Sequence, residues 1–238
     1  MAVSFAIPRY DLPRASRALA ALMRNPDDLP QVFTLLEAMS GTAPHRLLRR
    51  FRRTPTGARL LRDEPDIVPI LADREGLRRL PAGSLGRAYL AFVESEGISA
   101  QEILDASRAG RSSEPRPRAF RYLRDRMRDT HDLWHAVTGY KGDTLGELAL
   151  LAFILAQNFN LALAMIVGGG LLKGIGRTDM HLVIDGYRRG RAAAWLPPQD
   201  WETMLALPID EVRRRLHLGP APEYTPIRTV DMRAAGVI

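Results

Sequence analysis

The 238-residue sequence contains no cysteine and only two lysines, Lys141 and Lys173. Without cysteine it can form no disulfide, no thiolate nucleophile and no cysteine-ligated zinc or iron–sulfur site. Any bound metal must therefore be held by histidine and carboxylate side chains. Arginine supplies nearly all of the positive charge, and the formal net charge is +7. We interpret most of these scattered arginines as a solvated surface, which can also attract phosphates or anionic membranes.

Alternating stretches rich in β-branched residues, which are typical of strands, are also absent. Leucine, alanine, arginine and glutamate instead recur at helical spacing, which predicts an all-α fold. The length of the chain and its 46% hydrophobic content suit one soluble core. We therefore predict a single-domain multi-helix bundle over residues 1–238, with an ordered core over residues 13–218.

Nucleic-acid-binding motifs are missing too, since there is no zinc-finger spacing and no RNP-like aromatic motif, so we expect no nucleic-acid partner. Residues 1–10 lack the features of a secretory signal or a transit peptide, which predicts a cytoplasmic protein. The densest basic cluster is Arg46–Arg53, which also contains Leu47, Leu48 and Phe51. Such a basic amphipathic stretch can lie on anionic headgroups, so we predict peripheral attachment to the inner face of the cell membrane.

Proline and glycine divide the sequence into segments with helical periodicity. The predicted helices span residues 15–23, 29–39, 44–53, 66–78, 84–96, 99–109, 118–137, 144–167, 178–195 and 201–216. A capping pattern, Ser99 with Glu102, begins the helix at 99–109. Residues 110–117 are predicted to form an exposed loop, and the chain beyond Pro220 is predicted to be irregular.

The longest apolar run is Leu148–Val167, which is about as long as the roughly 20-residue helix that spans a bilayer. Gln157, Asn158 and Asn160 interrupt this run, so we interpret it as a buried core helix. The sequence therefore predicts one long apolar helix, 144–167, which follows the helix at 118–137 and packs antiparallel against it.

The segment HDLWH contains the strongest candidate for a functional site, formed by His131, Asp132 and His135. Residues four apart on a helix lie about 40° apart around its axis, so the two histidines can bind one ion. The carboxylate of Asp132 can reach the same ion or orient a bound water. Two imidazoles with one or two carboxylates suit Zn²⁺ or Fe²⁺ better than Ca²⁺ or Mg²⁺.

Glu147 follows His135 after eleven intervening residues and lies beyond a loop. Because the next helix can fold back at this loop, Glu147 is a candidate fourth ligand. The alternative is a capping box, in which Thr144 caps the helix and the Glu147 carboxylate binds the Thr144 amide. The sequence leaves both interpretations open.

The HDxxH motif with Glu147 resembles the signature of the coenzyme Q biosynthesis protein 4 family. Three further segments resemble that family, so the likeness extends over about residues 30–216: Leu80–Tyr89, Gly146–Glu147 and the arginine-rich Trp201–Leu216. The resemblance implies an all-α protein that acts in ubiquinone synthesis. It implies binding of a polyprenylated 4-hydroxybenzoate at the membrane and removal of the carboxyl group at ring carbon 1, with an oxidative variant of the reaction as an option.

The same resemblance implies that a metal, Zn²⁺ or alternatively Fe²⁺, is held by His131, Asp132, His135 and Glu147. Asp132 or Glu147 would also transfer a proton, so both residues are catalytic candidates. A polyprenylated quinone precursor, other enzymes of ubiquinone biosynthesis and a second copy of the chain are the expected partners. The small residues of Leu148–Val167 can wall a tunnel for the isoprenoid tail, and the missing mitochondrial leader indicates a bacterial homologue.

Three other functions are alternatives. HDxxH differs from the HExxH motif of metallopeptidases by one methylene, which moves the base away from the scissile carbonyl. A His-Asp phosphohydrolase needs a second histidine upstream, and the only one here is His45. The third alternative is a non-catalytic scaffold that presents prenylated intermediates to other enzymes and contains a structural metal.

Overall fold

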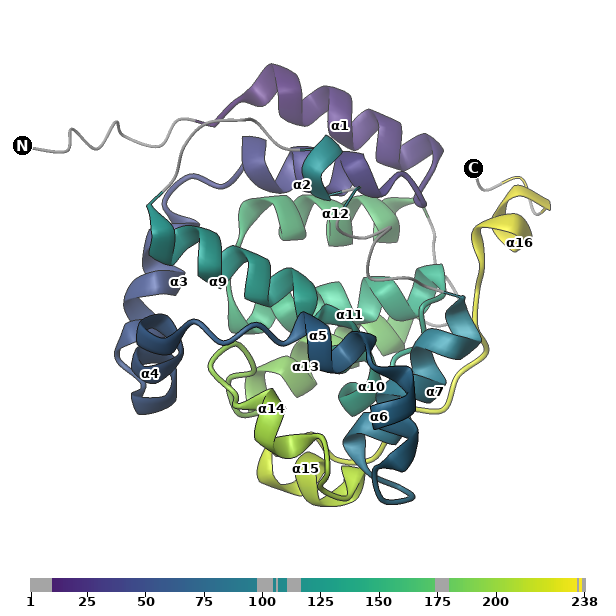
Figure 1. Ribbon diagram of the computed structural model, residues 1–238. Coiled ribbons are helices and arrows are strands. Elements are labelled where there is room, and N and C mark those ends of the chain that lie inside the picture. Colours follow the sequence, from purple (N-terminus) through teal and green to yellow (C-terminus); the bar gives the residue numbers. More distant parts are fainter. Residues whose placement is uncertain are drawn as a thin grey trace, which may run out of the picture.

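The computed structural model describes residues 10–97, 105, 107–110, 117–173, 180–234 and 236. Within these residues the chain is helical with no strand, and the only β-type pairing is an isolated bridge between Ser84 and Pro208 (Figure 1). The all-α prediction is therefore confirmed. The helices are α1 (Leu12–Arg24), α2 (Leu29–Ala38), α3 (Ala43–Arg52), α4 (Pro55–Asp63), α5 (Val68–Ala72), α6 (Arg74–Arg79), α7 (Leu85–Glu96), α9 (Arg118–Asp129), α10 (His131–Thr138), α11 (Thr144–Gln157), α12 (Leu161–Leu172), α13 (Met180–Ala192), α14 (Trp201–Met204), α15 (Ile209–Arg215) and α16 (Thr229–Ala234).

Side-chain caps fix the starts of several helices. The carboxylate of Asp11 accepts a hydrogen bond from the Arg14 amide at the start of α1. At the start of α7 the hydroxyl of Ser84 accepts one from the Arg87 amide in the same way. These bonds satisfy amides that have no partner inside the helix. The predicted helices at 15–23, 29–39, 44–53 and 84–96 are accordingly found close to their predicted bounds.

The main core surrounds α11, whose side chains are buried on nearly every side. Its closest neighbour is α13, and two glycines allow the two helices to approach. A Cβ atom on Gly186 would lie 2.4 Å from the Ala149 carbonyl oxygen, and one on Gly190 would lie 2.3 Å from that of Phe153. Small residues spaced four apart thus bring the two backbones into direct contact. Ala149 and Ala152 are buried in this core, so α13 occupies the side where the sequence suggested a tunnel wall.

Two smaller apolar clusters extend the core. One joins α1, α2 and α12 through Ala18, Leu35 and Ala162. The other joins α3, α4 and α9 around Phe51, which is fully buried. In the view of Figure 1 the first cluster lies above the main core and the second lies toward its left, and the described helices form a single multi-helix domain.

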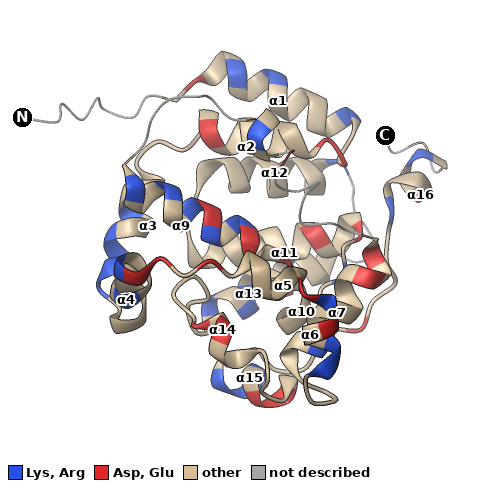
Figure 2. Cartoon of the chain, in the orientation of Figure 1, with Lys and Arg blue, Asp and Glu red and all other residues tan. Residues whose placement is uncertain are grey.

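The basic stretch at α3 faces two ways. Leu48 and Phe51 are buried against α4 and α9, so the apolar side predicted to enter a membrane packs inside the protein. The arginines at 46, 49, 50, 52 and 53 are exposed, and in Figure 2 much of the α3 ribbon is blue, the colour of Lys and Arg. Among the described helices, none combines the length and apolar character needed to cross a bilayer.

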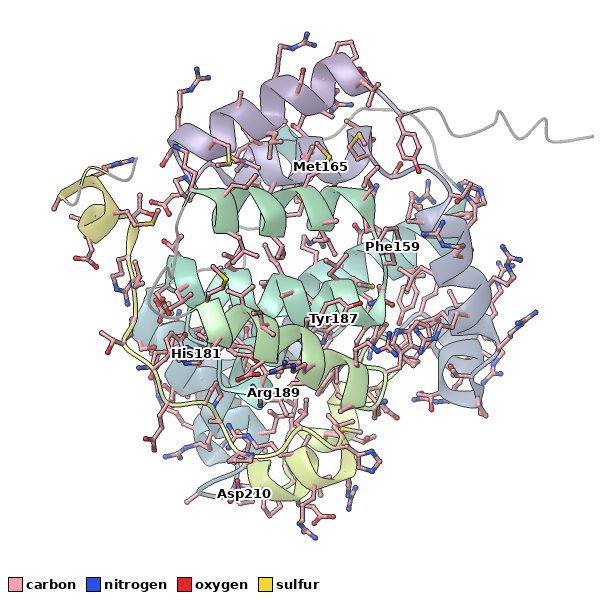
Figure 3. The ribbon with its side chains drawn as sticks, turned by 180° about the vertical axis from the view of Figure 1, so that it is seen from behind. Phe159, Met165, His181, Tyr187, Arg189 and Asp210 are labelled. Carbon is pink, nitrogen blue, oxygen red and sulfur yellow. The ribbon has the colours of Figure 1, made fainter. Side chains whose placement is uncertain are left out.

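The prediction of one long helix at 144–167 is wrong, because the chain breaks between α11 and α12. The backbone of Asn158 leaves the helical conformation (φ −139°, ψ 73°) and ends α11, and the side chain of Asn160 accepts a hydrogen bond from the Ala162 amide to begin α12. The break folds α12 back along α11, where it also packs on α1 and α2, and it leaves Phe159 on the face seen in Figure 3. The helix that we took to be interrupted by polar residues is therefore two helices with polar caps.

Other predicted helices are also divided. The segment 118–137 breaks at Thr130, whose hydroxyl donates to the Arg126 carbonyl between α9 and α10. The segment 201–216 forms α14 and α15, because Pro208 lacks an amide hydrogen and the chain turns before it. In the segment 66–78, Asp73 ends α5 and caps α6.

Some predictions fall on other parts of the chain. The helices α4 and α16 were not predicted, although the chain between Pro220 and α16 is irregular as expected. Most of the predicted helix at 99–109 and loop at 110–117 lies outside the described residues. The helices predicted at 118–137 and 144–167 were expected to pack antiparallel against each other. This contact is a minor one, since α10 packs chiefly on α7 and α11 packs chiefly on α13.

Candidate metal centre

His131 and His135 project from the same side of α10, as their spacing predicts. Their ring centroids lie 4.9 Å apart and the rings meet edge to face. The side chain of His135 is fully buried, whereas that of His131 is 27% exposed. The imidazole of His135 is therefore fixed inside the protein, and that of His131 is partly exposed to solvent.

Glu147 lies on the first turn of α11 and reaches both histidines. Its Oε1 is 3.0 Å from Nε2 of His135, and its Oε2 is 4.0 Å from Nε2 of His131. One ligand atom from each residue can be chosen so that all three lie within 4.8 Å of one another. The chain therefore folds back after α10 and brings Glu147 to the two histidines, as the prediction of a fourth ligand required.

The capping-box alternative for Glu147 is wrong. The residue that caps α11 is Asp143, whose Oδ2 accepts hydrogen bonds from the amides of Leu145 and Gly146. Thr144 is the first residue of the helix, and its hydroxyl contacts the hydroxyl of Thr229 at 3.2 Å. The carboxylate of Glu147 is consequently not engaged at the helix end and points to the histidines.

The ring of His135 has only one nitrogen with an ordinary hydrogen-bond partner. Its Nδ1 lies 3.0 Å from the Tyr140 carbonyl oxygen, which can only accept, so Nδ1 carries the hydrogen. In the neutral ring, Nε2 then presents a lone pair, and this buried atom has no hydrogen-bond partner among the described residues. A lone pair facing the Glu147 carboxylate at 3.0 Å needs a cation or a proton between them. A histidine held by a backbone carbonyl at one nitrogen is the arrangement that metal-binding histidines adopt.

Asp132 lies beside the three-residue group and not within it. It is 9% exposed, and its Oδ1 is 3.5 Å from Nδ1 of His131. A carboxylate in this position orients the imidazole and increases its basicity. Tyr89 of α7 lies nearby, and burial together with the charge of Asp132 raises the pKa of its phenol.

The charges of the site favour a cation. Burial alone would lower the pKa of His131, but the hydrogen bond with Asp132 and the charge of Glu147 raise it. Burial alone would raise the pKa of Glu147, but in the metal-free site the positive charge and hydrogen bond of a protonated His135 lower it to about 2. Glu147 is therefore ionised at neutral pH. A negative carboxylate between two imidazoles is a donor set that fits Zn²⁺ or Fe²⁺.

Several residues that shape the site were not found from the sequence. Phe92 of α7 stacks on His135, with ring centroids 4.9 Å apart and planes 12° from parallel. The hydroxyl of Tyr224 donates to Oδ1 of Asp143 and accepts from the Lys141 amide, both at 2.8 Å. A Cβ atom on Gly146 would lie 2.2 Å from that hydroxyl, so the residue before Glu147 must be small.

Comparison with known families identifies the family of the chain. The family model described as "Coenzyme Q (ubiquinone) biosynthesis protein Coq4" matches residues 10–222, which is most of the sequence. The chain belongs to the Coq4 family. The resemblance inferred from the HDxxH motif is thereby confirmed, and the family is described as one of ubiquinone biosynthesis proteins.

Curated relatives of the Coq4 family agree with this assignment. The ubiquinone biosynthesis protein coq4, mitochondrial, of Aspergillus clavatus is 34% identical over 191 residues, which cover 77% of this chain. That of Neosartorya fischeri is 31% identical over 235 residues, which cover 96% of this chain and 75% of the relative. The chain spans less than two thirds, 64%, of the Aspergillus clavatus protein.

A solved structure has the Coq4-type fold as well. The crystal structure of a protein from Nostoc punctiforme PCC 73102, described as a ubiquinone biosynthesis protein, aligns with a TM-score of 0.66. The alignment covers 89% of this chain and 100% of that chain at 21% sequence identity. At this identity the comparison shows that the fold is shared.

Proposed function

We propose that this Coq4-family protein is a metal-dependent carboxy-lyase that removes the C1 carboxyl group of a polyprenylated 4-hydroxybenzoate at the membrane surface. Zn²⁺, or alternatively Fe²⁺, would be held by His131, His135 and Glu147. The observation that carries this proposal is the Nε2 lone pair of His135, which faces the Glu147 carboxylate at 3.0 Å while Nδ1 is committed to a backbone carbonyl. Family membership supports the choice of pathway.

The proposed reaction suits a ring with a para oxygen. The phenol oxygen pushes electrons toward the carbon that bears the carboxylate, and a proton adds at that carbon. The bond to the carboxyl carbon then breaks, its electrons return to the ring, and CO₂ leaves with hydrogen in its place. A bound metal would supply Lewis-acid polarisation of the head group. The oxidative variant would leave a hydroxyl group instead and would need an oxidant such as O₂.

The residues of the chain would divide the work. His131 and His135 would bind and orient, with the buried His135 as the fixed member of the pair. Asp132 lies outside the three-residue group and 3.5 Å from His131, so we assign it to orienting that ring and holding a proton, not to the metal. The neighbouring histidines lower the pKa of Glu147 and keep its carboxylate ionised, so we assign it to the metal and not to proton donation.

The remaining parts of the proposal concern location and partners. The exposed arginines of α3 supply a basic surface that can rest on anionic headgroups, although the apolar side of the helix is used inside the protein. The polyprenylated tail would then enter from the bilayer. Binding to other enzymes of ubiquinone biosynthesis and to a second copy of this chain remains a prediction.

The proposal is tested by following release of the carboxyl carbon as CO₂ from a prenylated 4-hydroxybenzoate by metal-loaded protein. The variant His135→Ala should lose this activity. His181→Ala is a matched control, because His181 is exposed on α13, on the face shown in Figure 3, and is not one of the three grouped residues. The product, with hydrogen or hydroxyl at ring carbon 1, distinguishes the simple reaction from the oxidative one.

Equal CO₂ release by His135→Ala and His181→Ala would contradict the catalytic proposal. Binding of metal and prenylated substrate without any CO₂ release would instead favour the scaffold alternative. Hydrolysis of a peptide, without release of CO₂, would favour the zincin-like metallohydrolase.

A further inference from the structure

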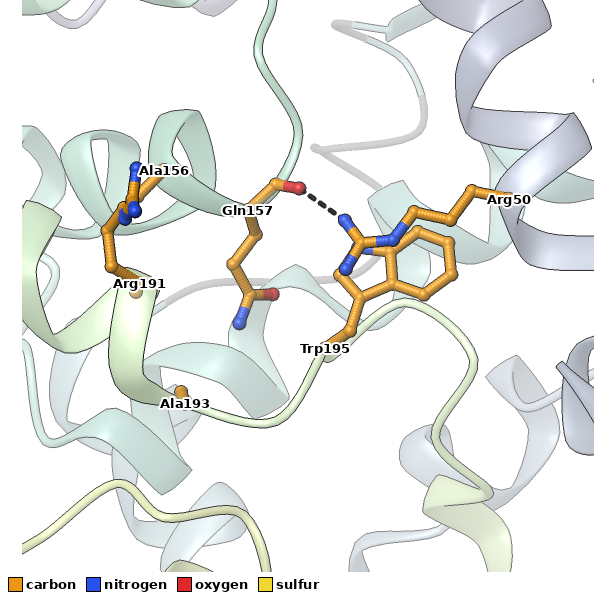
Figure 4. Close-up of a pocket in the computed structure, with 7 residues that line it drawn as sticks. Arg50, Ala156, Gln157, Arg191, Ala193 and Trp195 are labelled. Carbon is orange, nitrogen blue, oxygen red and sulfur yellow. Dashed lines mark hydrogen bonds between the residues drawn. The ribbon is translucent and has the colours of Figure 1, made fainter.

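A second site lies at the opposite end of α11 from Glu147. Seven described residues line a hollow of about 240 Å³ there, and three of them are small (Figure 4). This volume is below the roughly 300–1,000 Å³ of pockets that hold drug-sized ligands. The lining includes Arg50 and Arg191 but no aspartate or glutamate. The hollow therefore suits a small, negatively charged group.

Arg50 is held in position by two contacts. Its Nη1 donates to the Gln157 carbonyl at 2.8 Å, and its guanidinium carbon lies 3.9 Å from the ring centroid of Trp195. The indole is fixed in turn, because its Nε1 donates to Oδ1 of Asn158 at 2.7 Å. A guanidinium has five N–H donors, and this is the one hydrogen bond that Arg50 makes within the described chain. Most of its donors thus stay available on a group that is already oriented.

The base of the hollow is rigid. The side chain of Gln157 is held at both polar atoms, since its Nε2 donates to the Ala194 carbonyl and its Oε1 accepts from the Leu196 amide. Gly190 lies directly against the Phe153 backbone, which fixes α13 on α11. The walls that carry Arg50 and Arg191 are therefore held at a set spacing.

Arg191 supplies the second positive charge. It is exposed on α13 and makes no ion pair within the described part of the chain, and neither does Arg50. Arg188, one turn earlier on the same helix, contrasts with it by pairing with Asp185 at 3.1 Å. Figure 4 shows Arg191 on one side of Gln157 and the Arg50–Trp195 pair on the other. Arg50 and Arg191 thus line the same hollow without a carboxylate, and an anion bound in it would be attracted by both charges.

We propose that this pocket binds a phosphate group between the guanidinium groups of Arg50 and Arg191. Guanidinium and phosphate form paired, charge-assisted hydrogen bonds, and a tetrahedral phosphate can offer oxygens to two arginines on different sides. A planar carboxylate offers two oxygens and satisfies one such arginine. The phosphate group can be free phosphate or the headgroup of a phospholipid. The second source is included because Phe159, two residues after Gln157, is an exposed apolar side chain of the kind that contacts lipid, and its carbonyl accepts a hydrogen bond from Arg46.

The first test is a titration with inorganic phosphate at constant ionic strength, followed by tryptophan fluorescence. Trp195 lines the pocket, whereas Trp134 and Trp201 are fully buried, so the signal should vanish in Trp195→Phe. Arg191→Gln should weaken binding by about tenfold or more, as expected when a charge-assisted pair is lost. Arg188→Gln removes the same charge outside the pocket and should bind phosphate like the unaltered protein.

The second test separates the two sources. Vesicles of phosphatidylcholine, with and without phosphatidic acid, are sedimented with each variant. If the pocket takes a lipid headgroup, Arg191→Gln should reduce binding to the phosphatidic acid vesicles more than Arg188→Gln does. If it takes free phosphate, the two variants should differ in the titration and bind vesicles equally. Equal behaviour of Arg191→Gln and Arg188→Gln in both assays would overturn the proposal, as would an equal fluorescence change with chloride.

Discussion

The hydroxyl of Tyr224 lies 2.8 Å from Oδ1 of Asp143, and this bond ties the irregular segment before α16 to the start of the helix that carries Glu147. The Ile227 amide adds a second tie, since it donates to Oδ2 of Asp143 at 2.8 Å. The buried Asp143 thus caps α11 and anchors the C-terminal segment at once. The position of Glu147 depends on contacts that come from more than 75 residues further along the chain.

We first predict that Tyr224→Phe loosens the start of α11. The change removes the bonds to Asp143 and to the Lys141 amide, and each is worth about 1 kcal/mol of unfolding free energy. Thermal unfolding should show this loss, and the affinity for Zn²⁺ should fall because Glu147 is less well placed. Tyr187→Phe on the exposed face of α13 is the control and should leave both quantities unchanged. Unaltered zinc affinity in Tyr224→Phe would show that the tie does not position Glu147.

This dependence explains which parts of the site were predictable. His131 and His135 belong to one turn of helix, so their spacing alone brought them together. Glu147 needed only the next helix, and the sequence left its role undecided because the capping box has the same local pattern. Asp143, Tyr224 and Phe92 contribute through contacts with distant segments, for which no local pattern exists.

The fold was predictable in class and less so in its helix ends. Helical periodicity identified the helices but did not show that Asn158 and Asn160 are caps, because a polar residue within an apolar run looks the same at a helix end and in its middle. The burial of Phe51 had a similar cause. An amphipathic helix has one pattern whether its apolar side meets a membrane or the helices α4 and α9.

The second prediction separates ligands from the orienting residue. Glu147→Ala should abolish stoichiometric Zn²⁺ binding, whereas Asp132→Asn should weaken it by about 10- to 100-fold, as expected for a group that orients a ligand. Metal content per chain and zinc titrations measure the two effects. Because Asp143 caps α11, the helix should still form in Glu147→Ala. Full metal content in Glu147→Ala would remove it from the site, and complete loss in Asp132→Asn would make Asp132 a ligand.

The third prediction concerns pH. The pKa of His131 is raised above its ordinary value of 6.5, because the hydrogen bond with Asp132 and the negative charges of Glu147 and Asp132 together outweigh burial. Protons compete with a metal for this ring, so zinc affinity should fall as pH decreases through the raised pKa. Asp132→Asn should lower that pKa and shift the decline to lower pH. A pH series of zinc titrations tests this, and an unshifted profile in Asp132→Asn would contradict it.

The same groups predict how the metal-free protein responds to pH. A raised pKa of His131 stabilises the fold below pH 6.5, and this contribution disappears as pH rises through the raised value. The lowered pKa of Glu147 stabilises the fold above 4.5, and this contribution disappears as pH falls toward about 2. Unfolding free energies measured without metal should therefore decline toward both extremes. Glu147→Gln should flatten the acid side of this profile.

The last prediction tests the contact that positions α11. A Cβ atom on Gly186 would lie 2.4 Å from the Ala149 carbonyl oxygen, which is backbone and cannot move aside. Gly186→Ala must therefore push α13 away from α11, at a cost of about 1–3 kcal/mol of unfolding free energy. Gly168→Ala in α12 is the matched control, because its Cβ would meet nothing within 4 Å and alanine favours a helix over glycine by about 1 kcal/mol. The midpoint of denaturant unfolding should thus fall for Gly186→Ala and rise for Gly168→Ala. A stable Gly186→Ala protein would mean that the two helices can separate without loss, and that their close contact does not position α11 and Glu147.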